Sequence, residues 1–312
     1  ALPNTSGYES FVTNIGEVSN KGFDFQLGGT IIKNDNFSWN SDFNISFINN
    51  KVKKLPGGND IQQTERYLFG GVVSILREGE SLGSFYLYES NGVFSTAKEA
   101  AEAGYIDKIS KSNGGQPVAG DARWVDQNKD GVIDTKDKII AGNPIPDFTG
   151  GLNNTFKYKG LSLDAFFQFS KGNDVYNNFR TDLVRGFNTN YLKENLDAWK
   201  QEGDITDVPR NVLLDPANNS EGVVARPSTR FLEDGSFIKL KTVTLTYEFP
   251  NSVLEKLKLS GLKVYAKGTN LLTITKYSGF DPEVSVAQNN NAGQNGGFQF
   301  GIDRGLYPLS KS

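Results

Sequence analysis

The segment DQNKDGVIDTKD, which begins at Asp126, places oxygen donors at a spacing that suits a calcium ion. Gly131 stands at position six, where the loop of an EF-hand needs a sharp turn. Oxygens at alternating positions allow one short loop to wrap a hard cation. The spacing therefore predicts a Ca²⁺ site whose ligands are Asp126, Asn128, Asp130, the backbone carbonyl of Val132, Asp134 and Asp137.

Two features separate this segment from a calcium sensor. Asp137 replaces the usual Glu at position twelve, which weakens bidentate closure of the loop. The preceding residues ARWVD do not predict an entering helix, and a sensor needs paired helices that move on binding. We therefore expect a structural calcium clip within residues 120–143. The alternative is an Asp-, Asn- and Gly-rich turn without an ion.

The composition excludes several kinds of chemistry. The 312 residues contain no Cys, Met or His, so catalysis by Ser–His–Asp or Cys–His groups and disulfide formation are excluded within this sequence. Hydrolysis by a pair of carboxylates is not excluded. The formal net charge of -3, with 33 basic and 36 acidic residues, gives no reason to expect nucleic acid as a partner.

Aromatic residues in the polar segments are candidates for solute binding. Aromatic faces suit the apolar faces of sugar rings. The candidates are Trp124, Tyr86, Tyr88 and Tyr191. The alternative for each of them is packing within the loops.

The elements that must position these residues are predicted to be long strands. Residues 22–32 and 37–47 alternate between apolar and polar side chains, on either side of a turn at Asn34. Residues 152–158 and 161–170 form a second such pair, and 236–249 and 261–272 a third. The strands exceed the five or six residues usual in soluble sheets.

Long polar segments, at 55–80, 90–143 and 172–235, separate the strand pairs. Short turns at one end and long loops at the other are typical of an outer-membrane β-barrel. The sequence thus predicts an all-β, antiparallel transmembrane sheet, with an apolar face toward lipid and a polar face toward an aqueous lumen. Short helices are expected in the loops at 97–104 and 190–200.

Several stretches together resemble the C-terminal part of the SusC/RagA family of TonB-linked outer-membrane proteins of Bacteroidota. They run in family order over nearly the whole chain and are specific as a set. They are residues 14–27 (NIGEVSNKGFDFQL), 37–55, 120–177 (GDARWVDQNKDGVID and its continuation), 230–250, 263–283 (KVYAKGTNLLTITKYSGFDPE) and 301–312 (GIDRGLYPLSKS).

The resemblance implies a twenty-two-stranded barrel, occluded by an N-terminal plug, that imports glycans or peptides with energy delivered by TonB. It also implies a SusD-like surface lipoprotein that closes over the extracellular mouth. This sequence contains neither the plug nor a TonB box. It therefore looks like the last third of the barrel, and we expect one further strand after Ser312.

The leading hypothesis is part of an active outer-membrane importer of oligomeric nutrients, without enzymatic activity. The calcium-type loop then belongs to an extracellular loop near the lid. One alternative is a secreted, calcium-stabilised carbohydrate-binding β module. Another is a glycosidase with a carboxylate pair that the spacing does not reveal.

Overall fold

A computed structural model describes residues 16–64, 72–110, 113–184, 190–213, 215, 218–221, 226–284, 300–305 and 311. Residues 14 and 15 of the stretch 14–27 and half of the stretch 301–312 lie outside these ranges. Over the described residues, no helix combines the length and apolar character needed to cross a membrane.

Six long antiparallel strands form one sheet in the order β1-β2-β11-β12-β17-β18. They are β1 (Glu17–Lys33), β2 (Phe37–Lys54), β11 (Phe148–Tyr158), β12 (Leu161–Lys171), β17 (Phe237–Glu248) and β18 (Lys263–Thr275). These strands confirm the three predicted pairs. Within the described ranges the sheet does not close on itself, and β1 and β18 lie at its two edges.

The register aligns apolar side chains in rows that cross the sheet on one face. Because neighbouring strands pair antiparallel, residues directly opposite one another point to the same side. One row runs Leu27, Phe43, Leu152, Phe167, Leu240 and Leu272. Leu27 and Leu272 are more than half exposed, as suits a surface that meets lipid.

Gly150 leaves room on the sheet for the aromatic ring of Phe169. A Cβ atom at this position would lie 2.4 Å from the ring of Phe169, its cross-strand partner. The absence of a side chain at Gly150 therefore allows the Phe169 ring to lie over β11.

The opposite face of the same strands is polar. A row runs Gln26, Asn44, Gly151, Gln168, Lys239 and Thr273. Hydrogen bonds such as that from Thr155 Oγ1 to Asp164 Oδ1, at 2.7 Å, tie neighbouring strands on this side. This face has the character predicted for the wall of an aqueous lumen.

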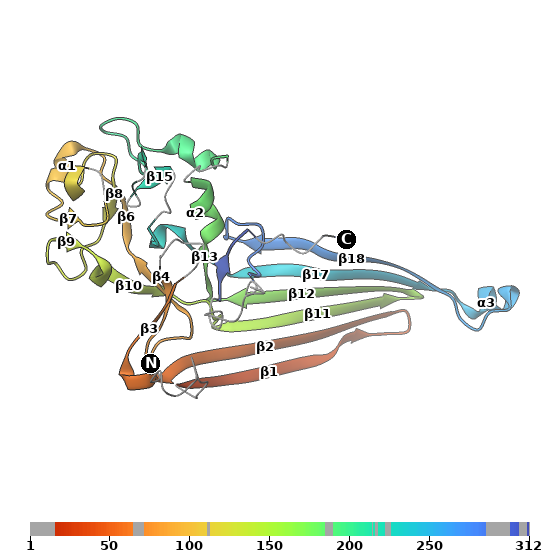
Figure 1. Cartoon of the computed structure of the whole chain (residues 1–312). Helices are drawn as coiled ribbons and strands as arrows, with labels where there is room; N and C mark the ends of the chain where they lie inside the picture. Colours follow the sequence, from red (N-terminus) through yellow and green to blue (C-terminus); the bar gives the residue numbers. More distant parts are fainter. Residues whose placement is uncertain are drawn as a thin grey trace, which may run out of the picture.

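The two ends of the sheet differ, as Figure 1 shows. At the turn end, β1 and β2 are joined by an Asx-type turn in which Asn34 Oδ1 accepts from the backbone of Asn36 and Phe37. β11 and β12 are joined by two residues, and β17 and β18 by a connection that holds α3 (Asn251–Leu257). At the loop end, the long segments fold together beyond the strands.

The loop segments contain many short elements and cores of their own. These elements are η2 (Pro56–Gly58), β3 (Ile61–Thr64), β4 (Val72–Leu76), β5 (Ser84–Tyr88), β6 (Ser90–Val93), α1 (Ala97–Ala101), β7 (Ile106–Asp107), η3 (Asn113–Gly115), β8 (Ala122–Trp124), β9 (Val132–Ile133), η4 (Thr135–Asp137), β10 (Lys138–Gly142), β13 (Asp174–Asn177), α2 (Asn178–Val184), η5 (Lys193–Asp197), β14 (Asn211–Leu213), β15 (Asn219–Glu221), η6 (Thr229–Phe231), β16 (Leu232–Asp234) and β19 (Ile302–Asp303).

The structure confirms one predicted loop helix and corrects the other. Within the predicted range 97–104, residues Ala97–Ala101 form the short helix α1, which Thr96 caps by accepting from the backbone of Glu99. The helix predicted over 190–200 is realised only in part, because this segment forms the five-residue 3-10 helix η5 and no α-helix. Leu196 faces solvent at 70% exposure, so the helical spacing does not mark a buried face.

Candidate functional site

The calcium-type loop is organised around its own backbone. The Gly131 N–H donates to Asp126 Oδ2 at 2.8 Å, and the Asp130 N–H donates to Asn128 Oδ1 at 3.0 Å. The Val132 N–H donates to Asp130 Oδ1 at 3.0 Å. These Asx-type contacts wind the chain into a compact loop and leave Asp126 Oδ1 buried without a hydrogen-bond partner.

In the last third of the loop, the side chains of Asp134 and Asp137 accept hydrogen bonds from the backbone. Asp137 is fully buried, and its two carboxylate oxygens accept from the backbone N–H groups of Gln127 and Asp134. Asp134 caps η4 by accepting from the Lys136 N–H and lies 3.4 Å from Lys108 Nζ. These contacts hold the pKa of Asp134 below its usual range. Asp137 therefore joins the two ends of the loop through hydrogen bonds.

Over the described residues, no three acidic side chains converge as a ready metal cluster. The oxygens of positions one, three and five nevertheless lie within one short turn. The unpartnered oxygen of Asp126 is the feature that fits a cation best, since a buried carboxylate oxygen needs a partner.

Two of the aromatic candidates for solute binding lie in the core of the loops. Tyr88 is 3% exposed and Trp124 7% exposed. The guanidinium of Arg226 lies over both rings, 4.7 Å from the centroid of Tyr88 and 4.5 Å from that of Trp124. Arg226 also pairs with the buried carboxylate of Asp107 at 2.5 Å. These two aromatic side chains therefore pack within the loops.

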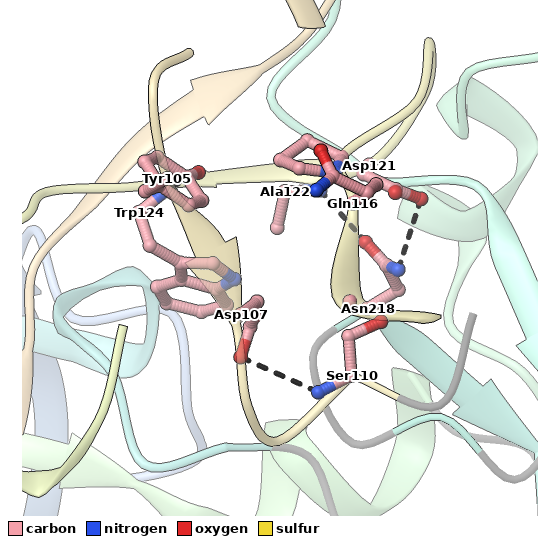
Figure 2. Close-up of a pocket in the computed structure, with 10 residues that line it drawn as sticks. Tyr105, Asp107, Ser110, Gln116, Asp121, Ala122, Trp124 and Asn218 are labelled. Atoms are coloured by element: carbon pink, nitrogen blue, oxygen red, sulfur yellow. Dashed lines mark hydrogen bonds between the residues drawn. The ribbon is translucent and has the colours of Figure 1, made fainter. Parts of the chain in front are cut away.

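Trp124 borders a small cavity of about 10 Å³, which Figure 2 shows. Asn218 spans one side of this cavity, where its Nδ2 donates to Asp121 Oδ1 and its Oδ1 accepts from the Ala122 N–H. A volume of this size suits one water molecule and not a sugar ring. Burial raises the pKa of Asp121 although Arg210 opposes the shift.

The other two aromatic candidates lie apart from this core. Tyr86 has Arg77 and Lys138 over its ring at 5.3 and 5.5 Å. Tyr191 is 47% exposed. The structure does not bring the four aromatic residues together into one binding surface.

A larger hollow, which the sequence did not reveal, lies between α2 and the segment that follows β18. Its volume is about 560 Å³. Phe179 of α2 and Phe280 face it with ring centroids 5.7 Å apart. Leu183 and Leu192 add further apolar surface. The lining residues come from four separate parts of the chain, so spacing alone carried no signal of the hollow.

Three charged groups of the hollow, Arg180, Glu194 and Glu233, are paired with one another. Arg180 Nη2 lies 2.9 Å from Glu194 Oε2, and its Nη1 lies 3.3 Å from Glu233 Oε1. Glu194 also lies 3.6 Å from Arg230, whose pKa burial lowers to about 10. Lys193 lies at the exposed rim.

This chain is similar to known proteins over most of its length. It is 37% identical to TonB-dependent receptor P3 of Formosa agariphila over 98% of this chain and 29% of that protein. It is 27% identical to TonB-dependent receptor SusC of Bacteroides thetaiotaomicron over 87% of this chain and 24% of that protein. A solved structure of the RagAB peptide transporter superposes with a TM-score of 0.71 at 28% identity, over 99% of this chain.

The chain is homologous to the TonB-dependent receptors of the SusC and RagA type. This confirms the resemblance seen in the sequence. The homology also confirms the all-β barrel architecture and the outer-membrane location, because SusC and RagA receptors are outer-membrane β-barrel proteins. No protein-family model matches the sequence. The chain spans about 30% of the length of the relatives that it matches.

Proposed function

We propose that this chain forms part of an outer-membrane importer of oligomeric nutrients, either glycans or peptides. The observation that carries the proposal is the two-sided sheet, with rows of Leu and Phe on one face and Gln, Asn and Lys on the other. Such a sheet separates lipid from an aqueous path. The named relatives are receptors and a peptide transporter, which supports transport over the glycosidase and the secreted module.

The partners that we propose are a TonB complex, reached through parts of the protein beyond this sequence, and a SusD-like surface lipoprotein. Large apolar side chains at the loop end support a protein contact there. Ile205 is 97% exposed and Leu196 is 70% exposed. Their segments are joined by the hydrogen bond from Thr206 Oγ1 to the Asp197 carbonyl at 2.7 Å. These two exposed side chains, which lie on joined segments, are the basis for placing the proposed contact here.

Uptake measurements test the import proposal. Cells that make the full-length protein, cells that lack it and cells that lack TonB would be given labelled oligosaccharides and oligopeptides. We expect uptake of one of these classes in the first cells and its loss in the other two. Equal uptake in all three strains for both classes would refute the proposal.

The lipoprotein contact has a separate test. Ile205→Asp in the full-length protein should reduce the amount of lipoprotein that copurifies, because a charge would be desolvated at the contact. Asp35→Asn, at the turn end, is the matched control and should leave copurification unchanged. An equal yield of partner with Ile205→Asp would exclude this surface.

We also propose that the loop at 126–137 binds one Ca²⁺ ion in a structural role. Asp126, Asn128 and Asp130 would supply side-chain oxygens, and Val132 its carbonyl. The buried, unpartnered Oδ1 of Asp126 supports this assignment. We retain Asp134 and Asp137 as candidates in the second half of the loop, where their present hydrogen bonds hold η4 and the loop ends.

A further inference from the structure

One wall of the hollow is formed by residues 277–283, which we call the strap. The strap follows β18 and lies against the polar face of the sheet, because its acidic residues reach Lys239 in the polar row of β17. The opposite wall is α2. The hollow therefore lies on the lumen side, where the loops meet the strands.

The strap is fixed at both of its ends. Tyr277 donates its hydroxyl hydrogen to Asp303 Oδ2 at 2.5 Å, and the Ser278 N–H and hydroxyl donate to Glu233 at 2.8 Å each. At the other end, Lys239 Nζ lies 2.8 Å from Asp281 Oδ1.

A second lysine strengthens this last anchor. Lys241 Nζ lies 2.6 Å from Glu283 Oε2, and Lys239 also contacts the Glu283 carboxylate. The Lys239 side chain is only 1% exposed. Breaking an ion pair at such a buried position leaves a costly unpaired charge. The cluster therefore holds Phe280, which lies between the two anchors, in a defined place.

Most polar groups of the hollow are already engaged, although Glu194 Oε1 accepts no hydrogen bond. The Glu233 carboxylate accepts hydrogen bonds from Asn177, Arg180 and Ser278. The formal charges of Arg180 and Glu194 are paired, as described above. Apart from Lys193 at the exposed rim, the charged side chains of the hollow already have partners of opposite charge, and sugar hydroxyls would compete with bonds that are already made. The remaining surface consists of aromatic and leucine carbon.

We propose that this hollow is a subsite for an uncharged apolar side chain of an oligopeptide solute. The proposal rests on the proposed import function and narrows its substrate class to peptides. The volume of about 560 Å³ lies within the range of small-molecule sites. An apolar side chain gains by leaving water at such walls, whereas a glycan would lose hydrogen bonds there.

Thiol protection in the full-length protein tests the subsite. This chain has no cysteine, so Leu183→Cys places a single reactive group in the hollow. Its labelling by N-ethylmaleimide would be followed by peptide mass spectrometry with trileucine, trialanine or maltotriose at equal concentration. We expect trileucine to slow labelling several-fold and the other two to have little effect. Asp35→Cys, which lies at the exposed turn end of the sheet, should be labelled at one rate throughout.

Two outcomes would overturn the proposal: equal labelling with all three solutes, or protection by maltotriose as strong as that by trileucine. Phe280→Ala in the Leu183→Cys background is a second measurement, and it should weaken protection by trileucine by about tenfold. Full protection in that variant would also refute the subsite. Protection without uptake would instead refute the import function alone, since labelling reports binding and uptake reports transport.

Discussion

The backbone amide of Gly131 donates a hydrogen bond to Oδ2 of Asp126 at 2.8 Å, while Oδ1 of the same carboxylate is buried without a partner. One oxygen thus shapes the loop, and the other remains available. A bound cation would satisfy the second oxygen and pull together the turn that contains Asn128 and Asp130.

Removal of calcium should loosen this loop. We expect a chelator to increase protease cleavage within residues 120–143 by several-fold, because the carboxylates would repel one another without the ion. Asp126→Asn should be cleaved equally with and without chelator. Asp35→Asn, far away at the turn end, should respond like the natural sequence. Cleavage that is unchanged by chelation would contradict the calcium proposal.

The assignment of the apolar face of the sheet to lipid leads to a second prediction. Phe167 lies in the apolar row between Leu152 and Leu240, so Phe167→Lys would place a charge toward lipid. We expect a loss of about 2–4 kcal/mol in assembly, measured as the fraction of full-length protein folded in the outer membrane. Gln168→Lys changes the next residue, on the polar face, and should assemble normally. Equal assembly of both variants would show that the face was assigned wrongly.

The strands could be predicted from the sequence because apolar and polar side chains alternate over most of residues 37–47 and 161–170, with Ser41 and Phe166 as exceptions. A two-residue period needs no knowledge of the partner strand. The loop core could not be predicted in this way. Arg226 contacts Tyr88 and Trp124 although it lies more than a hundred residues further along the chain, and a local pattern says nothing of such contacts.

The helix predicted over residues 190–200 was overestimated for a similar reason. Leu196 and Trp199 have the spacing of one helix face. In the structure, the indole Nε1 of Trp199 donates a hydrogen bond to the Ser95 carbonyl at 3.1 Å, and the indole ring packs closely against Gly120. Tertiary contacts therefore decide the conformation of this segment. The hollow was missed because Phe179 and Phe280 are distant in sequence.

The buried pair of Arg226 and Asp107 should be essential to the loop core. Asp107→Asn leaves the guanidinium buried without its counter-ion, which should cost about 3–5 kcal/mol. We expect faster backbone hydrogen exchange over β7, β8 and β9 in the full-length protein. Arg123→Gln removes the more exposed pair with Glu99 and should cost less than about 1 kcal/mol. Equal exchange in the two variants would contradict the assignment.

The combined substitution Asp107→Leu with Arg226→Met tests the same pair in another way. Replacing both buried charges by apolar groups removes the penalty of an unpaired charge. Exchange over β8 should then be slower than in Asp107→Asn alone. A double variant that exchanges as fast as Asp107→Asn would show that the aromatic contacts of the guanidinium matter more than its charge balance.

The loop core should become more stable as the pH rises above 8 because of Lys138. Burial, together with the nearby charge of Arg226, lowers the pKa of Lys138 to about 8, whereas an unfolded lysine has a pKa near 10.4. Between these values the unfolded chain binds more protons, so the free energy of unfolding rises with pH. This increase in the free energy of unfolding is absent below about pH 8 and amounts to roughly 1–3 kcal/mol when complete.

The measurement must stay below pH 10, because burial raises the pKa of Tyr88 and of Tyr105 to about 12. Raised tyrosine pKa values remove stability as the pH climbs above 10. We expect protease resistance of the loops to increase from pH 8 to 9.5 in the natural sequence and to stay level in Lys138→Met. Lys108→Met, which changes a mostly exposed lysine, should retain the increase. A rise of equal size in Lys138→Met would assign the effect to another group.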